Sequence, residues 1–552
     1  MNKQVIILVA VLLSAESWAA NYPLEIIQPQ PSLTTANRYY KAYPGLTYEV
    51  PIGVFGGLYP FTYALTANAT CDNSDADFSL DADTGIITWT NPTTDPDDNC
   101  TIEVTVTDAE ESTDTVSWTV DVTTTGFIFV DSVGGTNSSY NGCESDCGDG
   151  TIANPFLDLC DIYVGTGEDA CNDYAAMADA TYADYFVYFR AGTYEPEGYF
   201  ENSDQQYQIE WRTNKPTVWL AYPGETVIID HNAGSAAGAF FDSTGSASNP
   251  DMYVQGIKFQ DMLNHAFRII GNADRTVFYD NTFYNGGPGI DGQNSSFIMF
   301  SSTGGLTSAS YKLIKDNTFD TQTGHWAYIK TYSTNKTVLD GNIFTNPTGT
   351  SEGVAIKASD QYVSIRDNYI DGAFSGGSIA GNWASCSNMD ISFNNVLNAF
   401  NDYDTTLYGA LVINYHDTAD GPVYMYRNTL EGTVTVKWAT SDDGPFYLYN
   451  NVIVNENAAQ DVPDGSYITH YDVDDPDVII LGSGATANLV GSASDAIIDA
   501  NGDFTEAYSA YIGSKGHMLS GDTPGIGPVM NFNILGTGST SIGGGTGSTT
   551  IQ

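Results

Sequence analysis

A three-residue motif, Asn followed by any residue and then an apolar one, recurs along this 552-residue chain. Its seven copies are separated by 36, 25, 26, 27, 33 and 23 residues. They begin at Asn281, Asn317, Asn342, Asn368, Asn395, Asn428 and Asn451. A repeat of this length, built from β-rich runs and turns, predicts a solenoid, because one repeat cannot bury its apolar face alone. Asn tolerates the left-handed backbone of a sharp turn and can bond the same amide one coil above, so we expect a turn ladder.

The chain opens with a segment typical of a secretory signal, which we place at residues 1–19. Lys3 precedes the apolar run 5–13, and Ser17-Trp18-Ala19 fits a cleavage site. The run is too short to span a bilayer, and no other stretch is long and apolar enough to do so. We therefore predict a secreted or cell-surface protein without membrane insertion.

The charge balance is strongly acidic, with 68 acidic and 18 basic residues and a formal net charge of −50. The signal segment holds one charge of each sign, Lys3 and Glu16, so its removal leaves the net charge at −50. A surface of this kind repels nucleic acid and anionic membranes. The composition thus excludes nucleic acid as the expected partner.

Seven cysteines follow the signal segment, and in a secreted chain we expect them to pair. Cys71 and Cys100 are the natural first disulfide. A second group allows three pairings, between which the sequence does not choose, and consists of Cys143, Cys147, Cys160 and Cys171. Their irregular spacing favours disulfides over a zinc site. Cys386 stands alone, and we expect it to be a small buried hydrophobic residue.

Residues 22–125 are predicted to form a separate small β-sandwich. Segments 101–108 and 116–122 alternate between polar and apolar residues with a period of two, as half-buried strands do. Residues 80–89, LDADTGIITW, resemble a stretch of bacterial Ig-like, cadherin-like domains. This resemblance implies a spacer, or a module that binds sugars or surfaces, with no chemistry of its own. Residues 123–126 are the expected linker.

Residues 148–156, GDGTIANPF, and 188–194, YFRAGTY, resemble the signatures that open right-handed parallel β-helix proteins of the pectate-lyase-like superfamily. We therefore expect an all-β protein with a right-handed parallel β-helix over residues 127–530 and a Gly/Ser/Thr-rich disordered tail at 535–552. The resemblance does not fix the reaction, since this fold carries lyases, hydrolases, esterases, tailspikes and adhesins. A trimer is open, because parallel β-helices often assemble in that way.

Each coil has a β-rich run before the strand that bears the Asn motif. When these runs are aligned, the alternation of side chains predicts an outward direction for Arg268, Tyr328, Lys330, Lys357, Asn414 and Lys437. Lys330 and Lys357 become neighbours in one column, about 4.8 Å apart, with Lys437 in the same column further along. His265, His325 and Glu352 share an equivalent position just before these strands. Trp326 and Tyr328 flank Lys330, and His416 follows Asn414.

This column suggests a reaction centre, because the chain has only eleven lysines and adjacent like charges on a sheet cost stability. A β-helix lyase needs a cation that neutralises a uronate carboxylate and a base that takes the neighbouring proton. A lysine beside another lysine has a lowered pKa, which suits a base. We predict catalytic roles for Lys330, Lys357, His325 and Tyr328. The predicted substrate-binding residues are Arg268, Glu352, Trp326, Asn414, His416 and Lys437.

Other interpretations stay open at this point. The two lysines could form salt bridges on a solvated face, with Glu352 as one partner. The protein could be a non-catalytic adhesin that binds a polysaccharide or cell-surface glycan, with the Ig-like domain as its stalk. A hydrolase would need paired outward carboxylates, and the aligned strands show none. Ca²⁺ is an open cofactor, since Asp280, Asp316 and Asp367 recur beside the ladder, although solvated turn residues are the favoured interpretation.

Overall fold

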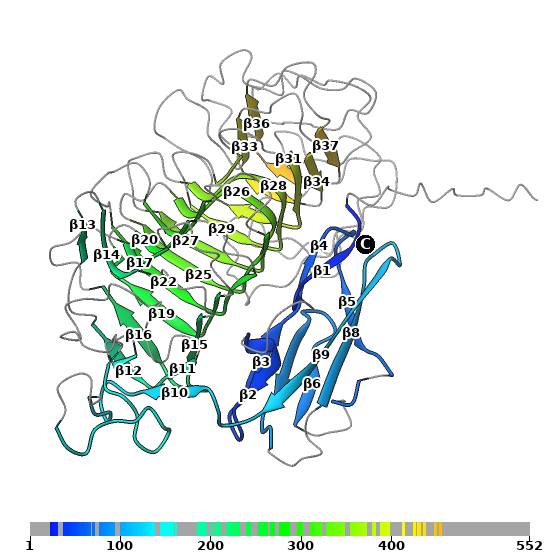
Figure 1. Cartoon of the computed structure of the whole chain (residues 1–552). Helices are drawn as coiled ribbons and strands as arrows, with labels where there is room; N and C mark the ends of the chain where they lie inside the picture. The colour runs from blue at the N-terminus through cyan, green and yellow to red at the C-terminus, as the bar shows by residue number, and fades with distance from the viewer. Residues whose placement is uncertain are drawn as a thin grey trace, which may run out of the picture.

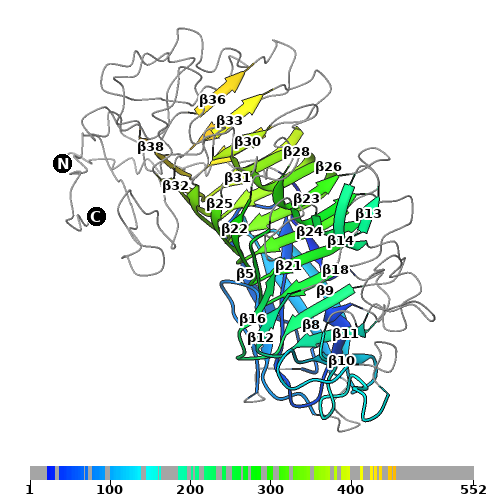
Figure 2. The ribbon, with the colours of Figure 1, turned by 90° about the vertical axis from the view of Figure 1, so that its left-hand side faces the viewer.

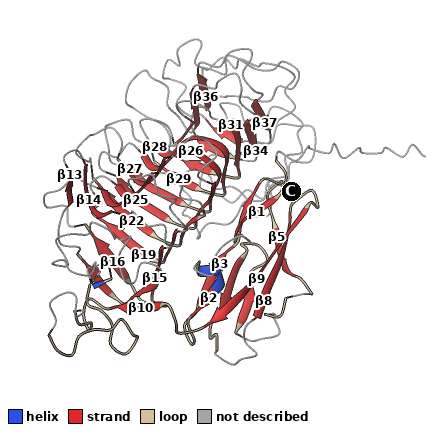
Figure 3. Cartoon of the chain, in the orientation of Figure 1, coloured by secondary structure: helices blue, strands red, loops and turns tan. Residues whose placement is uncertain are grey.

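The structure is a computed structural model of the chain, and it consists of β-strands joined by turns (Figures 1 and 3). Among the described residues, a 3-10 turn at Arg38–Tyr40 is the one helical element with three or more residues. That part consists of residues 22–30, 37–67, 69–71, 77–93, 100–137, 144–158, 161–162, 185–195, 200–202, 205–210, 217–231, 239–243, 252–262, 265–270, 275–287, 295–301, 310–322, 327–347, 354–372, 378–381, 387–397, 411–414, 423–426, 428–431, 434–437, 446–449 and 452–454. The predicted signal segment 1–19 and the predicted tail 535–552 lie outside it.

Residues 22–122 form a small β-sandwich, which we call the sandwich. Its first sheet pairs β1 (Glu25–Gln28) with β4 (Gly53–Phe55). The second has the order β2 (Lys41–Ala42), β9 (Thr113–Val122), β8 (Cys100–Thr107) and β5 (Thr62–Leu65), and the third has the order β3 (Tyr48–Pro51), β7 (Ile86–Trp89) and β6 (Phe78–Leu80). Alternate residues of β8 and β9 are buried, in agreement with their period-two pattern.

One predicted disulfide is present in the sandwich, where it joins Cys71 and Cys100. Cys147 is also disulfide-bonded. The remaining predicted cysteines lie outside the described residues and are Cys143, Cys160 and Cys171, together with the lone Cys386.

From Phe127 onward the chain winds into a parallel β-helix, whose strands stack coil upon coil (Figure 2). One sheet contains ten strands: β12 (Gly192–Tyr194), β16 (Val227–Asp230), β19 (Ile257–Gln260), β22 (Thr282–Gly286), β25 (Thr318–Gln322), β27 (Ile343–Pro347), β29 (Tyr369–Asp371), β32 (Asn395–Leu397), β35 (Thr429–Glu431) and β38 (Val452–Val454). The fold class predicted from the sequence, an all-β chain with a β-helix after a small sandwich, is confirmed.

The other sheet of the β-helix contains nineteen strands and bends around a corner of the coil. Two long strands, β26 (Ala327–Asp340) and β28 (Val354–Arg366), run through both of its halves. The half that faces the sandwich, the sandwich-facing half, contains β10 (Phe127–Val130), β11 (Phe186–Phe189), β15 (Thr217–Ala221), β18 (Met252–Gln255), β21 (Thr276–Tyr279), β24 (Ser310–Lys315), β31 (Ser387–Ser392), β34 (Val423–Tyr426) and β37 (Phe446–Tyr449).

The other half of the nineteen-stranded sheet, the distal half, contains β13 (Phe200–Asn202), β14 (Gln205–Glu210), β17 (Ala239–Ser243), β20 (His265–Ile270), β23 (Ser296–Ser301), β30 (Ile379–Gly381), β33 (Leu411–Asn414) and β36 (Val434–Lys437). Strands β13 and β14 pair antiparallel, whereas the other described pairings of the β-helix are parallel. Consecutive coils therefore stack in register, which places residues of different coils in columns.

The predicted asparagine ladder runs inside the β-helix. Each amide nitrogen donates to Oδ1 of the next asparagine at 2.9–3.0 Å, along Asn281, Asn317, Asn342, Asn368, Asn394 and Asn428. The choice of Asn395 as the fifth member was wrong by one residue, because the register pairs Ile370 with Val396 and so makes Asn394 the equivalent of Asn368. Beside the ladder, the rings of Phe283, Phe319 and Phe344 stack at 4.9 Å between centroids.

The residue before each of the first five ladder asparagines turns the corner of the coil in a left-handed conformation. These residues have φ between 54° and 69° and are Asp280, Asp316, Gly341, Asp367 and Phe393. A short polar side chain or glycine tolerates this conformation best. The recurring aspartates are therefore explained by the backbone of the turn.

The sandwich lies along the flank of the β-helix, against the sandwich-facing half (Figures 1 and 2). Buried residues of both units form a single apolar cluster, to which the sandwich contributes Tyr39 and Phe55 and the β-helix contributes Tyr188, Tyr253 and Leu313. The sequence predicted a separate spacer behind a linker. The structure differs because strands such as β10 and β11 are buried on both faces.

Candidate functional site

The two lysines of the sequence prediction lie side by side on the distal half. Lys330 of β26 pairs in register with Lys357 of β28, as the alignment of the runs predicts. The residues before them, Ile329 and Ile356, belong to the core. Because side chains alternate along a strand, both lysines are directed to the outer face of the sheet.

The column continues over the preceding coils. Lys330 pairs with Met299, Met299 with Arg268, and Arg268 with Asp242, which pairs with Glu210. We call these six residues, Glu210, Asp242, Arg268, Met299, Lys330 and Lys357, the charged column. With strands about 4.8 Å apart, Arg268 lies about 10 Å along the column from Lys330. The register also brings Glu210 and Asp242 to adjacent positions, in β14 and β17, which the predicted alignment of runs did not include.

Burial and like charge together change the chemistry of Lys330. The residue is 0 % exposed, and Lys357 is 6 % exposed. Burial first, and the neighbouring Lys357 second, lower the pKa of Lys330 from 10.5 to about 7. Desolvation disfavours the charged amine, and a second cation disfavours it further. Near neutral pH the amine of Lys330 is therefore divided between its charged and neutral forms.

Tyr328 does not join this column, and the prediction that it points outward is wrong. Its ring stacks on Phe297 at 5.6 Å and on Phe344 at 6.0 Å, inside the β-helix. Its hydroxyl donates to the carbonyl of Thr345 at 2.6 Å. The strand starts at a corner of the coil, where the period-two rule fails, so Tyr328 and Ile329 both face the core. We therefore assign Tyr328 to the core and not to a reaction.

Two further parts of the predicted alignment are corrected by the register. The column that contains Lys330 and Lys357 continues through Ala380 and Val412 to Thr435. Lys437 pairs with Asn414 instead. Lys437 and Asn414 thus lie two residues away from the charged column. His265 pairs with Ser296, which pairs with Ala327, so it does not share the position of His325 and Glu352. His265 is buried, with Nδ1 3.1 Å from the carbonyl oxygen of Ser296.

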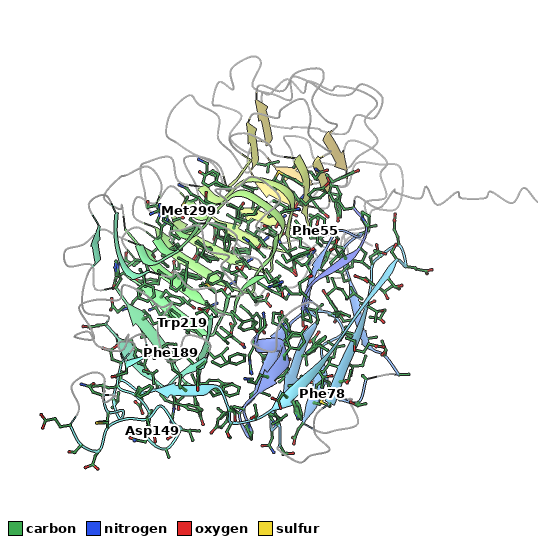
Figure 4. The ribbon with its side chains drawn as sticks, viewed as in Figure 1. Phe55, Phe78, Asp149, Phe189, Trp219 and Met299 are labelled. Atoms are coloured by element: carbon green, nitrogen blue, oxygen red, sulfur yellow. A yellow bond between two sulfur atoms is a disulfide. The ribbon has the colours of Figure 1, made fainter. Side chains whose placement is uncertain are left out.

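The other predicted site residues lie outside the described part of the chain: His325, Trp326, Glu352 and His416. For these four residues the sequence prediction stands untested. Arg268 is half-buried within the charged column. Figure 4 labels Met299, its neighbour in the column, on the side of the β-helix away from the sandwich.

The aspartates considered for Ca²⁺ have partners within the protein. The Asp367 carboxylate accepts a hydrogen bond from the Tyr59 hydroxyl at 3.1 Å, and Asp316 lies 3.9 Å from Lys315 Nζ. Burial, followed by repulsion from Glu49, raises the pKa of Asp280 to about 6. Within the described ranges, no group of three or more His, Cys, Asp or Glu side chains could hold a metal ion.

A second charged row was missed by the sequence prediction. On the sandwich-facing half, Lys315 Nζ lies 3.0 Å from Asp340 Oδ2, and Arg366 Nη2 lies 3.3 Å from the same oxygen. All three residues are buried. The sequence does contain a signal that this face is covered. Strands such as FIFV at 127–130 are apolar on both faces, which indicates that their outer surface does not meet water.

The comparison with known proteins concerns the sandwich. Residues 30–123 match the family described as "Putative Ig domain". No curated protein and no solved structure matches the chain. The predicted Ig-like domain is confirmed, while the resemblance of the β-helix to the pectate-lyase-like superfamily stays a prediction.

An Ig-like domain and a disulfide fit an extracellular protein, since disulfides persist in oxidising compartments. Among the residues that the structure describes, no helix has the length and apolar character needed to cross a membrane.

Proposed function

We propose that the protein is a secreted carbohydrate-active enzyme that cleaves an acidic, uronate-containing polysaccharide by β-elimination at the charged column. One observation carries this proposal: two buried lysines occupy adjacent coils, and one of them has a pKa of about 7. An anionic ligand would relieve the repulsion between them. Perturbed groups of this kind are typical of functional sites.

The proposed roles follow from the two protonation states. Lys357, as the ammonium, binds the uronate carboxylate and stabilises the charge that develops when the adjacent C5–H bond breaks. Lys330, as the neutral amine, takes the C5 proton. The electron pair forms the C4=C5 double bond, the C4–O bond breaks, and the departing oxygen takes a proton from water. A base whose pKa is near the working pH is the most effective.

The test is an assay of the protein with a panel of acidic polysaccharides, followed by the ultraviolet absorbance of the new double bond. We expect Lys330→Ala to lose about 10²–10⁴-fold in rate, which is the usual contribution of a general base. Lys258→Ala is the matched control, because Lys258 lies in β19 of the ten-stranded sheet, where its ammonium is 4.5 Å from the Tyr284 ring. Wild-type protein without any unsaturated product from the whole panel contradicts the proposal.

Access to the lysines is tested separately, since Lys330 is 0 % exposed. Reductive methylation at neutral pH should modify Lys330, and a substrate polysaccharide should protect it. If Lys330 resists modification in the free protein, the column is closed to ligands and the proposal fails.

The acidic end of the charged column defines the alternative outcome. Glu210 and Asp242 occupy adjacent register positions, and a glycosidase needs two carboxyl groups. Hydrolysis would give saturated product ends. The activity would then be lost in Glu210→Gln and in Asp242→Asn, and it would be kept in Lys330→Ala. Binding of a glycan without any cleavage would support the non-catalytic adhesin.

A further inference from the structure

We infer that the sandwich is permanently docked on the β-helix, so that the two form one rigid unit, and that it is not a mobile spacer. The outer face of the sandwich-facing half is an interaction surface whose occupant is residues 22–122 of this chain. This inference rests on contacts between the two units and does not depend on the proposed reaction.

The first support is the apolar composition of the outer face. One outward column runs in register through Phe127, Phe186, Val218, Tyr253, Val277, Leu313 and Val338. All seven are buried although they face away from the core of the β-helix. They share one apolar cluster with the core of the sandwich. Without the sandwich, this face would expose a continuous apolar patch to water, which soluble monomers rarely tolerate.

The second support is that aromatic contacts with the sandwich extend along the β-helix from β10 to β34. Tyr43 of the sandwich meets Phe127 of the first strand at 5.3 Å between ring centroids. Further along, Tyr59 meets Phe393 at 4.8 Å, and Tyr22 meets Tyr424 of β34 at 5.4 Å. Figure 4 labels Phe55, which lies on the sandwich where it approaches the β-helix. A small hinge contact would not involve coils so far apart in the sequence.

Hydrogen bonds and charges fix the register of this contact. Gln28 Nε2 donates to the carbonyl of Tyr311 at 2.7 Å, and the Tyr279 hydroxyl donates to Glu49 at 3.0 Å. Lys336 Nζ forms an ion pair with Glu25 at 2.6 Å. These partners are more than two hundred residues apart in the chain, so the bonds hold one specific arrangement of the two units.

The buried charged row is part of the same surface. The guanidinium of Arg366 lies 4.8 Å from the ring of Phe61 and 5.9 Å from the ring of Tyr59, both in the sandwich. A cation over an aromatic face is attracted by it, and more so when water is excluded. The hydroxyl of Tyr59 also donates to Asp367 at 3.1 Å. Domains move relative to one another by default unless their interface is large and apolar, which this one is.

The test is to cut the linker in the full-length protein. A protease site is inserted between Thr124 and Thr125, two exposed residues between β9 and β10. The uncut variant must show the same thermal transition as the parent protein. After cleavage, we expect the two fragments to elute as one species in size-exclusion chromatography, even at nanomolar concentration. Elution as two separate soluble fragments would overturn the inference.

A charge exchange in the cut protein keeps the result specific for this surface. Glu25→Lys removes this ion pair and should weaken association of the fragments by up to about 5-fold, since a partly exposed pair is worth up to about 1 kcal/mol. The double variant Glu25→Lys with Lys336→Glu should restore it. The matched control is Glu111→Lys, at an exposed turn of the sandwich. If the double variant gives no recovery, the fragments associate through another face and the inference is wrong.

Discussion

Strands β26 and β28 pair on both halves of the sheet, and buried charged residues face each other at both ends of this pairing. The two ends differ in whether these charges are alike or opposite. On the distal half Lys330 meets Lys357, whereas on the sandwich-facing half Asp340 meets Arg366. Lys315, buried beside Asp340, has a raised pKa: burial acts to lower it, but the attraction of Asp340 and Asp316 outweighs burial. Lys330 is buried as well, and its pKa falls to about 7 because burial lowers it and the neighbouring cation of Lys357 lowers it further.

The comparison shows that burial alone does not decide the state of a lysine. A buried cation with a carboxylate at 3.0 Å keeps its proton and stabilises the contact around it. A buried cation beside another cation gives up its proton more easily, and the repulsion lowers the stability of the folded state. The first arrangement is typical of structure and the second of function.

The largest effect should come from the counter-ion of the structural end. Asp340→Asn leaves Lys315 and Arg366 without the carboxylate at 3.0 and 3.3 Å, so two buried cations repel each other. We expect the free energy of unfolding to fall by about 3–5 kcal/mol, measured by urea denaturation. The control is Asp320→Asn on the ten-stranded sheet, which should cost about 1 kcal/mol or less. Similar losses in the two variants would mean that Asp340 does not hold the row together.

At the lysine pair we expect a substitution to raise the free energy of unfolding. Unfolded, Lys330 holds a proton up to pH 10.5, whereas in the fold it holds one only up to about pH 7. Between these values the unfolded chain binds more protons, so the Lys330 contribution makes stability rise with pH. Lys330→Met removes this slope and should stabilise the protein at neutral pH by on the order of 3 kcal/mol.

The measurement is urea denaturation at several pH values between neutral and pH 10.5, compared with Lys258→Met as the control. Lys258→Met should keep the slope of the wild type. A Lys330→Met protein that is less stable than wild type at neutral pH would show that Lys330 is a structural cation like Lys315. The two ends of β26 would then be alike.

The sequence predicted the β-helix and the pairing of the lysines for a clear physical reason. Coils that contain Asn342 and Asn368 differ in length by little from their neighbours, so a fixed repeat places Lys330 against Lys357. Later coils carry longer insertions, and there the repeat mispredicted the position of Lys437 by two residues. Tyr328 was mispredicted because alternation does not hold at the corner where its strand begins.

The docking of the sandwich could not be predicted from periodicity, because two surfaces that are far apart in the sequence must fit each other. The clue was local: in β10, β11 and β15 nearly every residue is apolar, and a strand with one solvated face would alternate. The charged row Lys315, Asp340 and Arg366 has no motif of its own, since each residue comes from a different coil, and only the apolar strands of the same face indicated that it is covered.

The smallest effect concerns Asp280, at the edge of the contact between the two units. Its pKa of about 6, against the usual 3.8, means that the fold binds a proton more tightly than the unfolded chain, so this group makes stability fall as pH rises through that window. Asp280→Asn keeps a residue that tolerates the φ of 54° and removes the charge. The burial that raises the pKa of Asp280 is partial, since part of the residue remains in contact with water, so screening limits the expected gain above pH 6 to less than about 1 kcal/mol. Thermal unfolding below and above this window, with Asp320→Asn as the control, measures it. An equal change in stability on both sides of the window would mean that Asp280 acts through the shape of its turn and not through its charge.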